Sequence, residues 1–104
     1  MKRGEIWLAE LPLPDKRRPV VLVSRDAAYE VREMLTVAPV TTRLRAVASH
    51  VAVGRDEGLD RNSAINCDRL QTVHRTVLRT RVGSLGPSAI DALDDALRYA
   101  LGLD

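Results

Sequence analysis

The chain has 104 residues, of which 45% are hydrophobic and 29% charged, a composition typical of one compact domain spanning residues 1–104. No apolar run approaches the length of a transmembrane helix, and the first residues lack the apolar segment of a signal peptide. We therefore expect a soluble, cytoplasmic protein without a membrane partner. Cys67 is the only cysteine, which excludes an internal disulfide and a cysteine-based zinc cluster.

The formal net charge of +2 conceals an uneven distribution. Residues 1–86 carry 15 Lys and Arg against 10 Asp and Glu, while residues 87–104 carry one against four. Fourteen of the 16 basic residues are arginine, a bias that genome composition explains as readily as nucleic-acid recognition does. Charge alone favours RNA or DNA binding only slightly.

The first two predicted strands flank a short loop. Residues 4–11 alternate between two faces, and Pro12 and Pro14 then end the strand and stiffen the loop. The apolar run Val20–Val23 predicts a second strand, buried on both faces. Pro19 suits the first position of that strand and biases Arg18 toward an extended conformation at its end.

The middle of the chain predicts short strands. Residues 25–34 support a loop or one helical turn, and residues 35–43 read as a third strand in which Thr41 and Arg43 share a face if the pleat is regular. Pro39 in this strand requires a free edge or a bulge for its missing donor. Four further short strands are predicted, at residues 50–53, 63–67, 70–73 and 81–85. A polar turn with two glycines joins the first two of them, and one helical turn precedes the last.

From Pro87 the apolar period becomes helical, through Ile90, Leu93, Leu97 and Leu101. Pro87 suits the first helical position, and Gly102 suits the residue after the end. Strands closed by one C-terminal helix predict a mainly β fold, a small antiparallel barrel.

Arg18 is the first candidate for chemistry, because a buried strand is a rigid mount for a guanidinium that can grip a phosphate or a carboxylate. A solvated basic turn is the plainer interpretation of the run at residues 16–18. No metal is expected, because His50 and His74 lie far apart in the sequence, and no glycine-rich loop precedes a helix, so no cofactor is expected. His50, near the basic turn at residues 43–45, is an outside candidate for acid–base work. Cys67 is expected to be a small buried strand residue.

The elements, in order, resemble the MazF/PemK-like toxin endoribonucleases of type II toxin–antitoxin systems. The resemblance covers nearly the whole length of the chain. The segments that carry it are residues 2–7, 18–24, 37–43, 58–59, 63–68, 70–73, 82–85 and the helix that ends near Leu103.

The resemblance implies an SH3-like barrel, a homodimer, a cognate antitoxin partner, and metal-independent cleavage of single-stranded RNA. It assigns the catalytic roles to Arg18 and Thr41. The nearby candidates for substrate binding are Lys16, Arg17, Thr42, Arg43 and Arg69. The products implied are a 2′,3′-cyclic phosphate and a 5′-hydroxyl end.

One segment departs from the family pattern. Many members carry a longer, glycine-containing loop between the first two strands, whereas residues 12–17 are short and proline-rich here. This difference motivates two alternatives, a non-catalytic toxin of the same fold that inhibits DNA gyrase, and a small RNA-binding module without chemistry.

Overall fold

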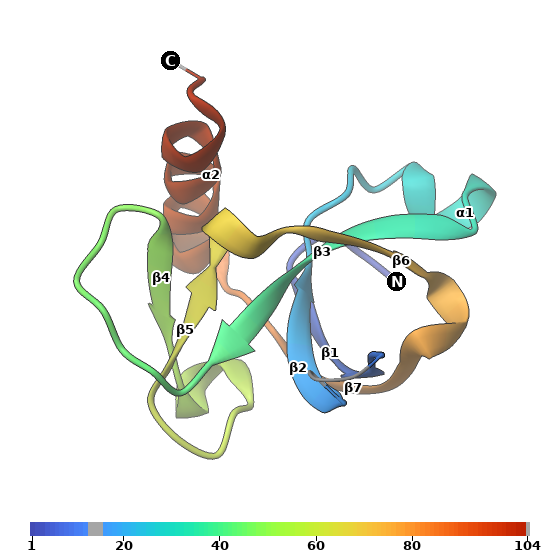
Figure 1. The fold of residues 1–104 in the computed structure, drawn as a ribbon, viewed down its shortest axis with the longest axis horizontal. Coiled ribbons are helices and arrows are strands. Elements are labelled where there is room, and N and C mark those ends of the chain that lie inside the picture. Colours follow the sequence, from blue (N-terminus) through green and yellow to red (C-terminus); the bar gives the residue numbers. More distant parts are fainter. Residues whose placement is uncertain (13–15, 104) are drawn as a thin grey trace.

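The computed structural model describes residues 1–12 and 16–103, and its strands are arranged as an antiparallel half-barrel with a helix against one end (Figure 1). The strand order is β4-β5-β3-β2-β1-β7, and β6 pairs with the first half of β3. Every pairing is antiparallel, so the predicted mainly β fold with a C-terminal helix is confirmed. The strands are β1 (Glu5–Glu10), β2 (Arg17–Leu22), β3 (Met34–Thr41), β4 (His50–Val53), β5 (Ser63–Asn66), β6 (Gln71–His74) and β7 (Leu78–Ser84).

The helical segments agree with the periodicity of the sequence. Helix α2 (Pro87–Leu101) has Pro87 in its first turn, and Gly102 ends it with a φ of 70°, a left-handed conformation that suits glycine. Its apolar stripe buries Leu93 and Ala96. The one predicted helical turn in residues 25–34 is α1 (Ala28–Val31), and three 3-10 turns complete the set: η1 (Arg55–Glu57), η2 (Cys67–Arg69) and η3 (Arg75–Val77).

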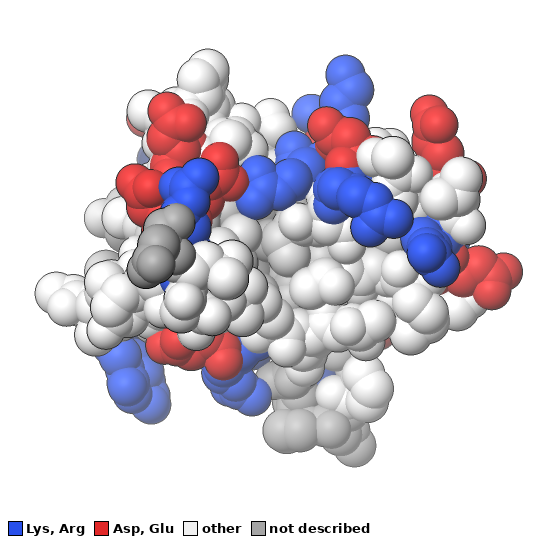
Figure 2. Space-filling model, turned by 90° about the horizontal axis from the view of Figure 1, so that it is seen from above, with Lys and Arg blue, Asp and Glu red and all other residues white. Residues whose placement is uncertain are grey.

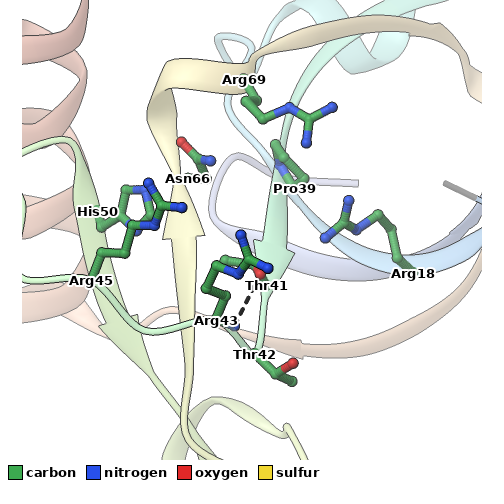
Figure 3. A pocket seen from close by; sticks show the side chains of 9 residues that line it. All are labelled: Arg18, Pro39, Thr41, Thr42, Arg43, Arg45, His50, Asn66 and Arg69. Atoms are coloured by element: carbon green, nitrogen blue, oxygen red, sulfur yellow. Dashed lines mark hydrogen bonds between the residues drawn. The ribbon is translucent and has the colours of Figure 1, made fainter. Parts of the chain in front are cut away.

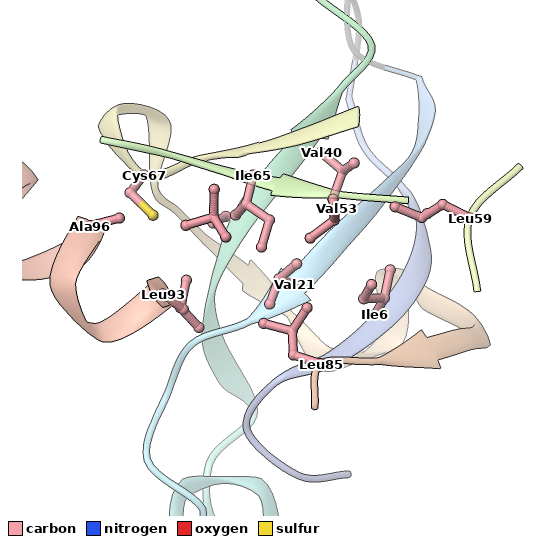
Figure 4. Close-up of a cluster of buried hydrophobic side chains, with 12 residues drawn as sticks. Ile6, Val21, Val40, Val53, Leu59, Ile65, Cys67, Leu85, Leu93 and Ala96 are labelled. Atoms are coloured by element: carbon pink, nitrogen blue, oxygen red, sulfur yellow. The ribbon is translucent and has the colours of Figure 1, made fainter. Parts of the chain in front are cut away.

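Strand β2 separates two apolar clusters, because its side chains alternate between the two faces of the sheet. Val21 packs in the first cluster with Ile6 and Leu93, between the sheet and α2 (Figure 4). Val20 and Leu22 pack in the second cluster, on the other face. All three β2 residues are fully buried, as predicted for a strand covered on both faces. Their burial makes β2 a rigid support for the residues at its start.

Two prolines lie at positions where a strand of the sheet gains or exchanges a neighbouring strand. On one edge of β3, β6 pairs as far as Val37 and β5 begins at Val40, so Pro39 falls in the interval between them. The predicted requirement for an edge free of partners is met there. Strand β2 begins at Arg17 and not at Pro19, because residues 17 and 18 already pair with Glu10 and Ala9 of β1. Pairing with β3 starts only after Pro19, at Val20.

The last strand is longer than predicted. The sequence indicated residues 81–85, but β7 starts at Leu78, because residues 78–80 pair with β1 although Arg79 and Thr80 are exposed. At the other end of β7, a Cβ on Gly83 would lie 1.9 Å from the carbonyl oxygen of Glu57. Glycine therefore lets η1 approach β7. No helix in the described ranges is long and apolar enough to cross a membrane.

Candidate active site

A hollow of about 490 Å³ opens where the end of β3 meets β2 and β5 (Figure 3). Five of the seven predicted site residues line it: Arg18, Thr41, Thr42, Arg43 and Arg69. The other lining residues are His50, the outside candidate for acid–base work, with Pro39, Arg45 and Asn66. The hollow is thus built from five separate parts of the chain, β2, β3, the segment after β3, the start of β4, and the junction of β5 with η2. We call it the arginine pocket.

Arg18 is held at its position by both its backbone and its side chain. It is the second residue of β2, opposite Ala9 of β1, and it points to the same side of the strand as the buried Val20. Its Nη2 donates a hydrogen bond to the carbonyl oxygen of Val40, at 3.2 Å. The side chain is partly buried. Arg18 therefore presents its guanidinium at the end of β3 from a support that cannot shift without disturbing the core.

Thr41 and Arg43 reach the pocket through a turn. Strand β3 ends at Thr41, so the pleat does not extend to Arg43, although the sequence predicted a strand to that residue. The backbone N–H of Arg43 donates to Oγ1 of Thr41 at 3.1 Å. Since Oγ1 accepts this bond, its own hydrogen is available for donation into the pocket. Figure 3 shows Arg43 beside Thr41, with Arg18 on the other side of β3.

A short hydrogen-bonded segment brings Arg69 to the pocket. Oγ of the buried Ser49 donates to Oδ2 of Asp68 at 2.5 Å, and the Cys67 N–H donates to the Ser49 carbonyl oxygen at 2.9 Å. The Asp68 N–H in turn donates to Oδ1 of Asn66 at 3.0 Å. These bonds fix η2 against the start of β4, so Arg69 and Asn66 keep their places in the wall.

Cys67 is nearly fully buried, as predicted, but it begins η2 and is not the strand residue that the sequence indicated, because β5 ends at Asn66. Burial raises the pKa of its thiol to about 11, and the negative charge of Asp68 adds to the rise. The sulfur therefore stays protonated at neutral pH, and it is not a nucleophile of the site.

His50 and Arg45 lie in the wall of the arginine pocket, next to each other as the sequence suggested. His50 pairs with Asn66 across the β4–β5 ladder, and its Nδ1 is buried without a hydrogen-bond partner in the described part of the chain. Arg45 comes from the exposed segment between β3 and β4. The basic turn at residues 43–45 signalled Arg45, whereas Asn66 carries no signal apart from its register opposite His50.

The residues of the arginine pocket that carry a permanent charge are all basic. Four of its nine lining residues are arginine and none is Asp or Glu. On the face shown in Figure 2, by contrast, basic and acidic side chains lie among one another. The described residues contain no group of three His, Cys, Asp or Glu that could hold a metal ion. Guanidinium groups repel cations, so the pocket suits an anion, and a phosphate above all.

Lys16 and Arg17 do not line this pocket. Arg17 points to the other side of β2, and its Nη2 lies 3.0 Å from Oε1 of Glu10. Lys16 has a φ of 54°, and its carbonyl oxygen accepts a 2.6 Å bond from the Leu11 N–H. Most of the loop predicted to be stiffened by prolines, residues 13–15, lies outside the described residues.

The family model for "PemK-like, MazF-like toxin of type II toxin-antitoxin system" matches residues 2–101. The chain belongs to this family. The MazF-like chain is 41% identical over 101 residues to the "Probable endoribonuclease MazF5" of Mycobacterium tuberculosis, with 95% of this chain and 91% of that one covered. It is 37% identical over 99 residues to "Endoribonuclease MazF3" of the same organism, with 95% and 93% covered.

Solved structures agree with this assignment. The "Mycobacterium tuberculosis toxin MazF-mt6" superposes with a TM-score of 0.89 at 36% identity, covering 96% of this chain and 98% of that one. An "Endoribonuclease in complex with its cognate antitoxin from Mycobacterial species" also reaches 0.89, at 25% identity, with 100% and 97% covered. A MazE–MazF structure from Deinococcus radiodurans, 18% identical with a TM-score of 0.76, covers 99% of this chain and 95% of that one and shows the same fold.

Proposed function

We propose that this MazF-like toxin, an endoribonuclease, cleaves single-stranded RNA in the arginine pocket without a metal ion, leaving a 2′,3′-cyclic phosphate and a 5′-hydroxyl. The observation that supports this most strongly is the meeting of Arg18 and Thr41 in a hollow with four arginines and no carboxylate in its wall. The RNA backbone is a polyanion, and such a hollow attracts it at every phosphate it can reach.

In the proposed reaction the 2′-oxygen attacks the adjacent phosphorus, and the bond from phosphorus to the 5′-oxygen breaks. The 2′-hydroxyl loses its proton and the departing 5′-oxygen gains one. Negative charge builds up on the phosphorane, and the fixed guanidinium of Arg18 stabilises it more than it stabilises the starting diester. The Thr41 hydroxyl donates a second hydrogen bond. Arg18 stays protonated throughout, so its role is electrostatic and not that of a base.

Substrate binding then falls to the residues around this pair. Thr42, Arg43 and Arg69 line the same pocket and are proposed to hold the phosphates on either side of the scissile one. Lys16 and Arg17 lie outside it, so they are proposed as weaker contacts along the path of the RNA. An exposed cation adds attraction for phosphate even when it is ion-paired, but less of it.

The partners proposed are a cognate antitoxin and a second copy of the toxin. A solved relative is titled as a complex with its cognate antitoxin, and its fold superposes on this chain. An acidic, flexible antitoxin segment that orders on binding would neutralise the same arginines that RNA needs. Free RNA should then compete with the antitoxin, which a binding assay at two RNA concentrations can measure.

The test is cleavage of a defined single-stranded RNA by the purified protein in EDTA, followed by analysis of the ends. We expect cleavage with a cyclic phosphate on one fragment and a 5′-hydroxyl on the other. Intact RNA beside a control ribonuclease that cleaves would refute the enzymatic proposal. Capture of gyrase without RNA cleavage would instead support the gyrase inhibitor, and RNA retention without cleavage would support the binding module.

A further inference from the structure

Asn66 has one end of its amide already occupied. Its Oδ1 accepts the 3.0 Å hydrogen bond from the Asp68 N–H and so caps η2. The orientation of the amide follows from this bond, because a backbone N–H requires the oxygen and not the NH₂ group. The other end, Nδ2, with its two hydrogens, is left on the pocket side of a half-buried residue that lines the arginine pocket. Asn66 therefore acts toward the pocket as a donor.

The groups around Asn66 have the same hydrogen-bonding character. The guanidinium groups of Arg43 and Arg69 carry donors and no acceptor. The Thr41 oxygen already accepts from the backbone, so its hydroxyl has a hydrogen to donate. Among the lining side chains, His50 and the hydroxyl groups of Thr41 and Thr42 keep acceptor capacity. The wall is thus rich in donors, and a ligand edge made of acceptors satisfies it best.

Asn66 lies on the opposite side of the pocket from Arg18. Strand β3 runs between them, since β2 pairs on one edge of β3 and β5 on the other, and Figure 3 shows Pro39 and Thr41 in the interval. Strands β2 and β5 are two strand spacings apart, roughly 10 Å. One nucleotide can span this distance, with its phosphate at one strand and its base at the other. With the phosphate at Arg18, a neighbouring base comes to Asn66. Because the amide is neutral, it adds discrimination between bases and little attraction for the backbone.

We propose that Asn66 is a specificity-determining residue that reads one base beside the scissile phosphate, selecting bases with a carbonyl oxygen at pyrimidine C4 or purine C6 over bases with an amino group at that position. This inference rests on the proposed function, in which RNA is the substrate. Uracil O4 and guanine O6 accept a hydrogen bond from Nδ2. Cytosine N4 and adenine N6 are donors, which leaves two donors facing each other, both unpaired on desolvation.

The experiment measures kcat/KM for a set of short RNAs that carry each base in turn at the positions flanking the cut, with inosine paired against adenosine to change only the group at C6 and N1. One mismatched hydrogen bond is worth about 1.4 kcal/mol, so the wild type should prefer the carbonyl base about tenfold at one position. Asn66→Ala should bring that ratio close to one. Asn66→Asp keeps the capping oxygen and the shape but replaces the donor with an acceptor, so it should reverse the ratio.

Asn62→Asp makes the same chemical change in an exposed loop and should leave the ratio at its wild-type value. Each ratio compares two substrates of one variant, so a general loss of activity cancels. A wild type without a carbonyl preference at any flanking position, or an unchanged ratio in Asn66→Ala, would overturn the proposal. If the wild type cleaves none of the RNAs, the proposed function has failed. The base preference of Asn66 is then tested separately, by comparing the equilibrium dissociation constants of the same RNAs.

Discussion

Arginines lie in two regions of this molecule that differ in the acidic side chains around them. In the arginine pocket, four guanidinium groups gather without an acidic side chain in the wall. On the outer surface of β1, β2 and β7, each arginine instead has a glutamate within reach. Arg17 and Arg79 share Glu10, at 3.0 and 3.4 Å, and Arg81 lies 3.6 Å from Glu5.

The difference shows that arginine content by itself does not mark a site. Arg17 and Arg18 are adjacent in the sequence, but strand alternation sends Arg17 to the outer surface beside Glu10 and Arg18 into the arginine pocket. A phosphate arriving at Arg17 competes with the carboxylate of Glu10, whereas the residues that line the arginine pocket include no carboxylate. The variants that follow test this contrast, from the largest expected effect to the smallest.

Arg18→Lys keeps the charge of the pocket and removes its planar fork. We expect the cleavage rate to fall about 100-fold, because a point charge cannot reproduce a bidentate grip on the phosphorane or the bond to the Val40 carbonyl oxygen. Initial rates on one RNA measure this. Arg79→Lys, the same change on the outer surface, serves as the control and should cleave normally. Near-normal cleavage by Arg18→Lys would show that charge alone suffices.

Thr41→Val removes a hydroxyl and keeps the branched shape. Loss of one transition-state hydrogen bond should lower the single-turnover rate about tenfold or more, with little change in RNA affinity. Thr80→Val makes the same change at an exposed position of β7. If both variants cleave at equal rates, Thr41 has no part in the chemistry.

The salt dependence of RNA binding distinguishes pocket arginines from paired ones. Arg43→Ala should reduce the slope of log K against log salt by roughly 0.7, the value for one phosphate contact with single-stranded RNA. Arg17→Ala should reduce it by less, since Glu10 already neutralises part of that charge. Fluorescence anisotropy over a range of salt measures both slopes. An unchanged slope in Arg17→Ala would show that Arg17 does not contact a phosphate. Equal reductions in the two variants would contradict the difference proposed between the pocket and the outer surface.

Glu5, on the paired surface, gives a small pH effect. Burial alone would raise the pKa of Glu5, but hydrogen bonds from Trp7 and the backbone, with the charge of Arg81, outweigh burial and lower it. A lowered pKa stabilises the fold above the ordinary glutamate pKa, and this stability is lost as the pH falls through the folded-state value. Glu5→Gln should therefore unfold about 0.5 kcal/mol more easily at pH 7, with no difference in strong acid. Urea denaturation measures it, with the exposed Glu30→Gln as control.

Much of the fold could be predicted because its strongest elements have periodic, capped sequences. Helix α2 runs from its proline to its glycine as predicted, and β4 has its predicted bounds. The start of β7 was missed because Arg79 and Thr80 are exposed and polar, and pairing with β1 decides the conformation of this part of the strand. Local pattern cannot show a strand whose partner is far away in the sequence.

The site was predicted in part, for a similar reason. Arg18 and Thr41 were assigned through the family resemblance, and the structure brings them to one pocket with Arg43 and Arg69. Asn66 was missed, because only its register in the β4–β5 ladder and the bond from Asp68 turn its amide toward the pocket. The opposite orientations of residues 17 and 18 follow from strand alternation, so this part of the arrangement could have been read from the sequence.

The most direct measurement compares Arg17→Ala with Arg18→Ala on the same RNA under single-turnover conditions, after thermal unfolding has shown that both fold. The two substitutions remove the same side chain from adjacent residues of one strand. We expect Arg18→Ala to cleave about 10² to 10³ times more slowly than the wild type and Arg17→Ala to stay within severalfold of it. Equal losses in the two variants, or near-normal cleavage by Arg18→Ala, would contradict the central claim that the arginine pocket performs the reaction.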